Sequence, residues 1–198
     1  MSTNVRYFVN GHLTQDAPSA VAGNNGPWAE QMLGGTLVKN GTQKPTGEVL
    51  AGKRFVALLF AGKWCPWCRA LEPKLQETYK KIQSLDPNDT EIVLLSCDND
   101  QGAFDEWFGQ QPWAAAPYEV AQGENGKTPI GYVRKAKRDA GKPQGTLGEQ
   151  FKLASVPQLI VLDGATGTVV TDKPMEQAGT KSDQGYNWTD LAPETWLK

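Results

Sequence analysis

The chain has 198 residues, of which 39% are hydrophobic and 21% are charged, and its net charge at pH 7 is -2. These values predict a globular domain with its own core and exclude a disordered or fibrous chain. Residues 1–13 contain no apolar signal stretch, and no apolar run is long enough to span a bilayer. We therefore expect a cytoplasmic protein without a membrane partner.

The first 27 residues predict an extension ahead of the main domain. Two short strands, Arg6–Val9 and His12–Thr14, flank Asn10-Gly11, a pair that supplies the positive φ angles of a tight hairpin turn. We therefore divide the chain into an N-terminal extension over residues 1–27 and a single domain over residues 28–198.

A short helix and a second hairpin are predicted at the start of this domain. The helix covers Trp28–Leu33, and the hairpin joins a strand at Thr36–Lys39 to a strand at Gly47–Leu50. Between those strands, the stretch Asn40–Pro45 begins with Asn-Gly and ends with Pro, and it predicts a turn.

The middle of the chain alternates between strands and helices. Arg54–Ala61 is apolar without alternation, which predicts a strand buried on both faces. From Cys68 to Leu85 apolar residues recur at helical spacing, which indicates an amphipathic helix. A buried strand at Glu91–Cys97 and a helix at about residues 101–109 follow. This order predicts an α/β fold with parallel central strands and right-handed crossovers.

The last third of the chain is harder to interpret. Between Ala114 and Gly148 repeated glycines interrupt every candidate helix, so no element can be placed there. A short helix is predicted to end at Phe151–Ala154, and a terminal hairpin pairs Gln158–Leu162 with Thr168–Thr171. We expect the tail from Tyr186 to Trp196 to pack two tryptophans against the core.

The sequence Trp64-Cys65-Pro66-Trp67-Cys68 joins the central strand to the amphipathic helix and predicts a redox centre. Thiol–disulfide exchange needs one ionised, exposed thiol and a second thiol that can expel the first from a mixed disulfide. At the helix N-terminus, Cys65 is favoured as a thiolate by unpaired N–H groups and the helix dipole. Cys68 follows one turn later on the same face. Pro66 suits the first helical position, where no N–H is needed.

Aromatic and basic residues surround the two cysteines. We expect Trp64 and Trp67 to contact a partner protein and to exclude water from the exchanging sulfurs. Lys63 and Arg69 add positive charge that favours the thiolate, although solvent screens most of it.

The alternative interpretation is that Cys65 and Cys68 form half of a zinc site or are inert. A structural zinc site needs two further ligands, and the chain offers only Cys97 and His12, both outside a second paired motif. The motif therefore favours redox chemistry without a metal. Cys97 ends an apolar strand and is predicted to be a small core residue.

The order of elements and several short motifs resemble the tryparedoxins and nucleoredoxins of the thioredoxin fold. The resemblance covers about Trp28 to Thr171 and implies a thioredoxin-like fold with a mixed central sheet flanked by helices. The shared residues are Leu50-Ala51-Gly52-Lys53, Trp64-Cys65-Pro66 with Cys68-Arg69, Pro112-Trp113 with Pro117-Tyr118, and Val156-Pro157-Gln158-Leu159-Ile160 with Asp163 and Gly167.

This resemblance implies a role for each site residue. Cys65 would be the nucleophile, Cys68 the resolving cysteine, and Pro157 a cis proline lying against the disulfide, which is feasible because the cis form costs little before proline. The backbone of Val156 would then pair with an extended substrate segment. The implied substrate contacts are Trp64, Pro66, Trp67, Val156 and Pro157.

The implied activity is the reduction of protein disulfides without a cofactor. Peroxiredoxins or glutathione-peroxidase-like enzymes would be the recipients, and a small dithiol or a reductase would be the electron source. The alternative is a binding module in which the same disulfide acts as a switch with little turnover.

The chain departs from the family pattern at several positions. Trp67 stands where family members commonly carry a second proline, and Leu59 where thioredoxins carry a buried aspartate. Asp172–Met175 replaces a segment in which tryparedoxins carry arginines. Residues 123–145 form a basic insertion, which we interpret as a solvated loop or helix face because no aromatic stacking surface accompanies the charge, so no nucleic-acid partner is expected. The alternative is a docking loop or a site for an anionic partner. The basic residues of the insertion are Lys127, Arg134, Lys135, Lys137, Arg138 and Lys142.

Overall fold

The computed structural model describes residues 27–122 and 155–171, short pieces at 7–9, 12–14, 181–182 and 185–186, and the single residues Leu147, Phe151 and Leu153. The basic insertion at 123–145 and the tail beyond Tyr186 lie outside these residues. So does most of the short helix that is predicted to end at Phe151–Ala154.

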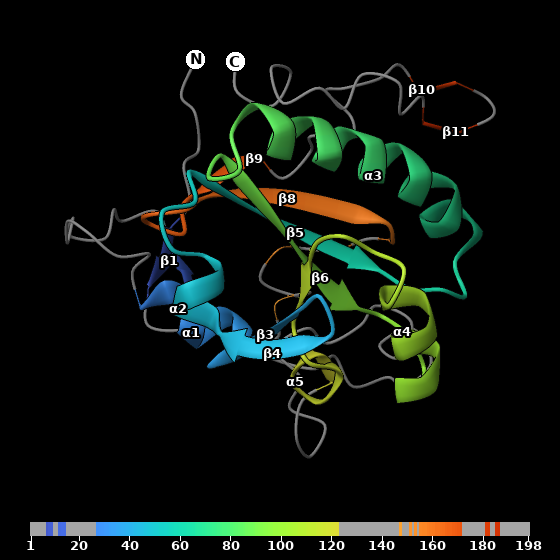
Figure 1. Ribbon diagram of the computed structural model, residues 1–198, viewed down its shortest axis with the longest axis horizontal. Coiled ribbons are helices and arrows are strands. Elements are labelled where there is room, and N and C mark those ends of the chain that lie inside the picture. Colours follow the sequence, from blue (N-terminus) through green and yellow to red (C-terminus); the bar gives the residue numbers. More distant parts are fainter. Residues whose placement is uncertain are drawn as a thin grey trace.

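A mixed seven-stranded sheet forms the centre of the molecule, with strand order β4-β3-β7-β6-β5-β8-β9 (Figure 1). β5 pairs in parallel with β6 and antiparallel with β8, so the predicted parallel centre and terminal hairpin are both confirmed. The strands are β3 (Thr36–Lys39), β4 (Thr42–Pro45), β5 (Phe55–Ala61), β6 (Thr90–Ser96), β7 (Ala114–Ala115), β8 (Gln158–Asp163) and β9 (Val169–Thr171).

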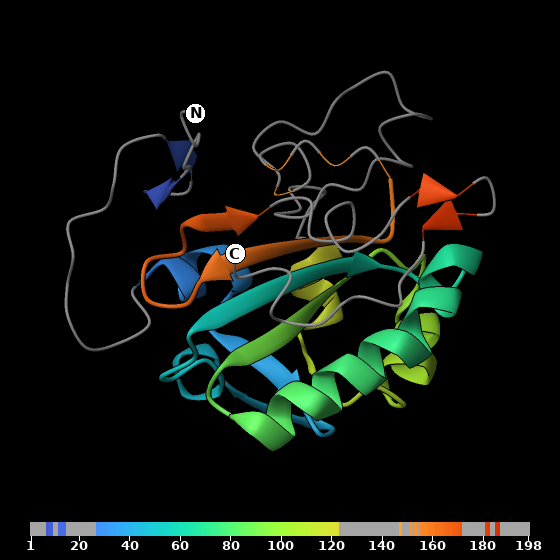
Figure 2. The ribbon, with the colours of Figure 1, turned by 90° about the horizontal axis from the view of Figure 1, so that it is seen from above.

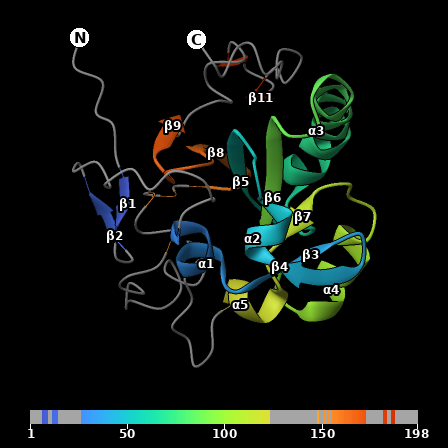
Figure 3. The same cartoon turned by 60° about the vertical axis from the view of Figure 1, so that its left-hand side comes forward.

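Helices cover both faces of this sheet, as Figures 2 and 3 show. Alternate residues of β5 point to opposite faces, because side chains alternate along a strand. Leu59 and its alternates pack with α3 and α4, whereas Leu58 and its alternates pack with α1 and α5. The helices are α1 (Trp28–Leu33), α2 (Thr46–Val49), α3 (Pro66–Leu85), α4 (Gln101–Phe108) and α5 (Tyr118–Gln122). No helix in the described part of the chain is both long and apolar enough to cross a bilayer.

Two small antiparallel pairs lie outside the main sheet. β1 (Tyr7–Val9) and β2 (His12–Thr14) form the predicted N-terminal hairpin. β10 (Lys181–Ser182) and β11 (Gly185–Tyr186) form a second pair, which the sequence does not predict.

The hairpin near the start of the domain is confirmed, but the prediction of its return strand is wrong. Asn40 and Gly41 alone make the turn, both at positive φ (52° and 72°), so pairing resumes already at Thr42. Gly47–Leu50, the predicted strand, instead contributes to α2. The Thr46 hydroxyl donates to the Gly34 carbonyl at 2.5 Å, which turns the chain back towards α1.

Two further elements lie in the glycine-rich stretch where no element is predicted. β7 has only two residues and α5 only five, so neither is long enough to show a periodic pattern. The position of β7 is determined by its pairing with two strands that are distant in sequence, β6 and β3, between which it lies.

The turn after β8 packs directly on the chain that enters β5. The Gly164 N–H donates to the Arg54 carbonyl at 2.8 Å, and a Cβ at Gly164 would overlap the backbone oxygen of Lys53. This contact joins the start of β5 to the end of β8.

We therefore expect Gly164→Ala to lower the free energy of unfolding by about 3 kcal/mol, because the backbone must shift to admit the methyl group. Gly35→Ala is the control, since its Cβ would meet no atom within 4 Å. Urea denaturation monitored by circular dichroism measures both variants. Equal stability of the two variants would contradict the packing described here.

Candidate active site

The five-residue cysteine motif lies where β5 ends and α3 begins (Figure 1). Cys65 is the N-cap residue of α3, and its Sγ accepts a hydrogen bond from the Cys68 backbone N–H at 3.4 Å. Pro66 occupies the start of the helix, as predicted, where its missing N–H leaves no bond unmade. The nucleophile candidate therefore faces one of the unpaired donors at a helix N-terminus.

A second loop, far away in the sequence, meets the motif. The Val156–Pro157 peptide bond is cis, as the family resemblance implies, and it directly precedes β8. The Cys65 thiol donates to the Val156 carbonyl oxygen at a distance of 3.5 Å. Because β8 is the neighbour of β5, the sheet itself places this loop next to Cys65.

Both motif cysteines are buried, although only Cys68 is predicted to be shielded. Cys68 is 2% exposed, which confirms that it is shielded, but Cys65 is only 3% exposed, so the expectation of an exposed nucleophile is wrong. The cause is local packing: Cys65 belongs to the same apolar cluster as Leu59 and Cys68, and Val156 lies against it. A client sulfur can reach Cys65 only where this covering opens.

Burial determines the protonation of the other two thiols. It raises the pKa of Cys68 far above the usual range, a backbone hydrogen bond from Gly62 partly opposes the shift, and the adjacent Cys65 adds to it. Burial also raises the pKa of Cys97, which is 2% exposed as predicted for a core residue. Both groups are therefore thiols at neutral pH.

The two tryptophans of the motif have different environments. Trp64 is half-buried, and its indole Nε1 donates to the Cys97 carbonyl at 2.7 Å. A Cβ at Gly62 would lie 2.7 Å from that nitrogen, so a glycine is needed beneath the ring. Trp67 is 54% exposed and forms the open aromatic surface beside Cys68.

Asp98 is a candidate site residue that no sequence motif indicates. Its carboxylate is buried, accepts from the Lys63 backbone N–H at 2.6 Å, and accepts from the Ser96 hydroxyl at 2.9 Å. Burial raises the pKa of Asp98, and these hydrogen bonds partly oppose the shift. The signal was its position directly after a buried strand, at the sheet edge where Cys65 lies.

The basic residues around the motif are already engaged by the protein. Lys63 forms an ion pair with Glu106, and Arg69 Nη1 donates to the Lys63 carbonyl at 2.6 Å. Leu59 occupies the core beside both cysteines, so no acid lies at that position. Within the described ranges, no group of three His, Cys, Asp or Glu side chains could hold a metal ion.

Known proteins with similar sequences have been identified for this chain. Residues 52–128 match the family model described as thioredoxin-like. A probable nucleoredoxin 1 of Arabidopsis thaliana is 34% identical over 142 residues, which are 71% of this chain and 20% of that protein. Tryparedoxin of Trypanosoma brucei brucei is 30% identical over 128 residues, 63% of this chain and 74% of the relative.

Solved structures show the same fold. Native tryparedoxin I from Crithidia fasciculata superposes with a TM-score of 0.54 and 26% identity, covering 72% of this chain and 84% of that one. The chain spans only about a fifth of the plant nucleoredoxin but most of a tryparedoxin. The chain therefore belongs to the thioredoxin-like oxidoreductases, in the group that contains the tryparedoxins and nucleoredoxins.

Proposed function

We propose that the protein reduces disulfides in client proteins through Cys65 and Cys68. The observation that carries this proposal is the placement of Cys65 Sγ between two groups, the Cys68 N–H at 3.4 Å and the Val156 carbonyl at 3.5 Å. The first is a donor that a thiolate can accept from. The second is a backbone group at the edge where a client strand could lie.

The proposed reaction has two exchange steps. The Cys65 thiolate attacks one sulfur of the client disulfide, the client S–S bond breaks, and the second client sulfur leaves as a thiolate that takes up a proton. Cys68 then loses its proton and attacks Cys65 Sγ, which closes the Cys65–Cys68 disulfide and breaks the bond between Cys65 and the client. The first client sulfur leaves as a thiolate that takes up a proton. The client gains two electrons, and the protein is oxidised by two.

The timing of these steps follows from the burial of Cys68. Its raised pKa keeps it protonated while Cys65 makes the first attack. Once the mixed disulfide forms, Cys68 lies one helical turn from the sulfur that it must attack. Premature ionisation of both thiols is thereby avoided.

Client contacts are assigned to the residues that surround the sulfurs. Trp67 offers the exposed aromatic surface, and Val156 and Pro157 offer backbone for an extended segment, as in strand-addition recognition. Pro66, at the start of α3, is proposed to contribute to the surface that the client contacts. The hydrogen bond from Trp64 to the Cys97 carbonyl favours a role in holding the motif in place, alongside any client contact.

The proposed clients are peroxidases of the peroxiredoxin or glutathione-peroxidase-like type. This assignment rests on analogy with tryparedoxins and not on the site geometry. A small dithiol or a reductase would restore both thiols. The proposed compartment is the cytoplasm, where thiols are kept reduced.

A second candidate function is a redox-switched binding module. The burial of Cys65 favours it, because a covered nucleophile turns over slowly, and the exposed Trp67 supplies a binding surface. Turnover therefore discriminates between the two functions.

Insulin reduction with dithiothreitol tests turnover directly. We expect the wild-type chain to accelerate insulin precipitation, Cys65→Ser to fall to background, and Cys68→Ser to accumulate a mixed disulfide that is visible by mass spectrometry. Cys97→Ala is the control and should retain activity. If the folded, fully reduced wild-type chain does not accelerate insulin precipitation above background, the reductase proposal is contradicted. The redox-switched binding module is then the function that agrees with the result.

Alkylation of the native protein tests the assigned roles of the thiols. Because burial keeps Cys68 and Cys97 protonated, iodoacetamide at pH 8 should label Cys65 first, giving one carboxamidomethyl group per chain. Protein unfolded in guanidinium chloride should take up three groups. Labelling of Cys68 or Cys97 in the native protein as fast as Cys65 would show that the roles are assigned wrongly.

A further inference from the structure

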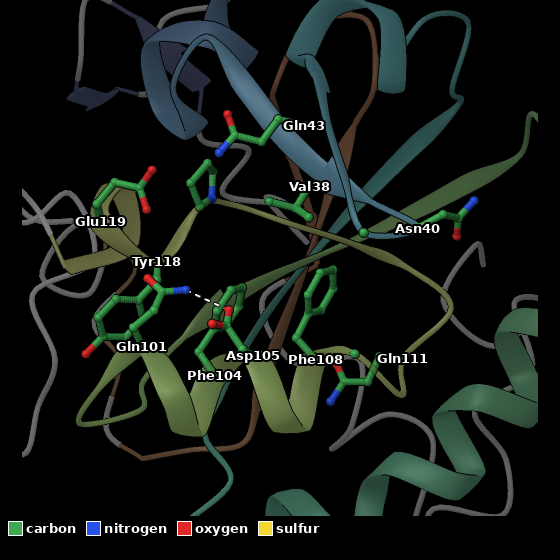
Figure 4. Close-up of a pocket in the computed structure, with 13 residues that line it drawn as sticks. Val38, Asn40, Gln43, Gln101, Phe104, Asp105, Phe108, Gln111, Tyr118 and Glu119 are labelled. Atoms are coloured by element: carbon green, nitrogen blue, oxygen red, sulfur yellow. Dashed lines mark hydrogen bonds between the residues drawn. The ribbon is translucent and has the colours of Figure 1, made fainter.

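A cavity of about 600 Å³ lies between the β3–β4 hairpin, α4 and the start of α5 (Figure 4). None of the residues that line it belongs to the cysteine motif, and no step of the proposed reaction uses it. Its volume falls in the range that binding pockets of proteins commonly have.

The cavity combines carboxylates with aromatic rings. Asp105 and Glu119 line it. Among the described residues, no lysine or arginine lines it and neither acid forms an ion pair. The Asp105 carboxylate accepts a hydrogen bond from the Gln101 amide at 2.7 Å, the dashed line in Figure 4. The part of the lining that the structure describes is therefore acidic, with no cation among its residues.

Three aromatic side chains form the inner wall. Phe104 and Phe108 stack with ring centroids 5.2 Å apart, and Tyr118 lies 5.9 Å from Phe104. Burial and the charges of Asp100 and Asp98 raise the pKa of Tyr118, so its phenol is protonated at neutral pH. Asn40 and Gln43 line the cavity from the hairpin.

We propose that this cavity docks an arginine side chain of the client protein. A guanidinium is planar, stacks on aromatic rings, and carries five N–H donors that suit carboxylate and amide oxygens together. A lysine ammonium has three donors and no planar group, so it would contact fewer of the carboxylates, amides and rings that line the cavity. The inference rests on the proposed function, since a client must supply the arginine.

A second feature favours a peptide over a simple organic cation. Gln111 also lines the cavity, is 8% exposed, and has a side-chain nitrogen without an acceptor among the described residues. A buried donor without an acceptor is costly, and a peptide brings carbonyl oxygens as well as a cation. The cavity is also large enough for backbone on either side of the arginine.

A short chain of contacts connects the cavity to the reactive centre. The Tyr118 hydroxyl donates to the Asp98 carbonyl at 3.5 Å, and the Asp98 carboxylate accepts from the Lys63 N–H, next to Trp64. Phe104 belongs to the same apolar cluster as Cys65. Helix α4 contacts Lys63 through Glu106 and lines the cavity with its other residues, so a client that occupied both places would lie along α4.

Binding of a sulfur-free probe tests the proposal. Acetyl-Gly-Arg-Gly-amide, titrated into the reduced 198-residue chain, should give saturable amide shift changes at Gln101, Asp105, Tyr118 and Glu119 in two-dimensional NMR spectra. The same peptide with citrulline, which keeps the shape but lacks the charge, should bind about tenfold more weakly.

Variants locate the contact. The double variant Asp105→Asn with Glu119→Gln should also weaken binding about tenfold, because two exposed ion pairs are lost. Both positions are exposed, so the fold should be unaffected, and thermal melting checks this. Glu77→Gln, an exposed acid on α3 away from the cavity, is the matched control and should bind as wild type does.

Equal affinity for the citrulline peptide, or an undiminished affinity of the double variant, would overturn the docking site. So would shift changes confined to the cysteine motif. Because the probe has no sulfur, these results are independent of turnover. Insulin reduction without probe binding would contradict only the docking site, whereas probe binding without insulin reduction would support the docking site and contradict only the reductase.

Discussion

The position of β5 between β6 and β8 is the constraint on which the rest of the structure depends. All seven residues of β5 are buried. Because β6 runs parallel to β5 and β8 runs antiparallel to it, the ends of β5 and β6 and the start of β8 meet at one edge of the sheet. Cys65, Asp98 and Pro157 come from the three loops at that edge. Their meeting is thus a consequence of strand direction, and it needs no contact between the loops themselves.

The parts of the fold that could be predicted are those with a long, uniform pattern. β5, β6 and α3 are seven, seven and 20 residues long, and their apolar residues identify them without tertiary information. β7, with two residues, has no pattern of its own and exists only because β3 and β6 flank it. The return strand β4 was misplaced for a related reason: all four of its residues are exposed, so no apolar alternation indicates a strand.

The same distinction applies to the site. Spacing and the strand-to-helix context indicate Cys65 and Cys68 as the candidate pair, because a helix turn brings two such residues together. The burial of Cys65 and the anchoring of Trp64 depend on neighbours that are distant in sequence, Val156 and the Cys97 carbonyl. Asp98 was missed since its partners are a backbone N–H and a hydroxyl, groups that every chain contains and no motif records. The sequence therefore predicts which side chains could react, but it does not predict how exposed they are or which distant residues hold them in place.

The hairpin that forms one wall of the cavity also ends the sheet. Its outer strand, β4, is only four residues long, is exposed throughout, and carries Lys44 beside Pro45. A short edge strand with a lysine and a proline is a poor template for a further strand, because the proline has no N–H and the charge resists desolvation. The edge beside the cavity is therefore protected against strand-to-strand aggregation. A partially unfolded chain that approaches this edge meets side chains and few backbone groups that can form strand hydrogen bonds.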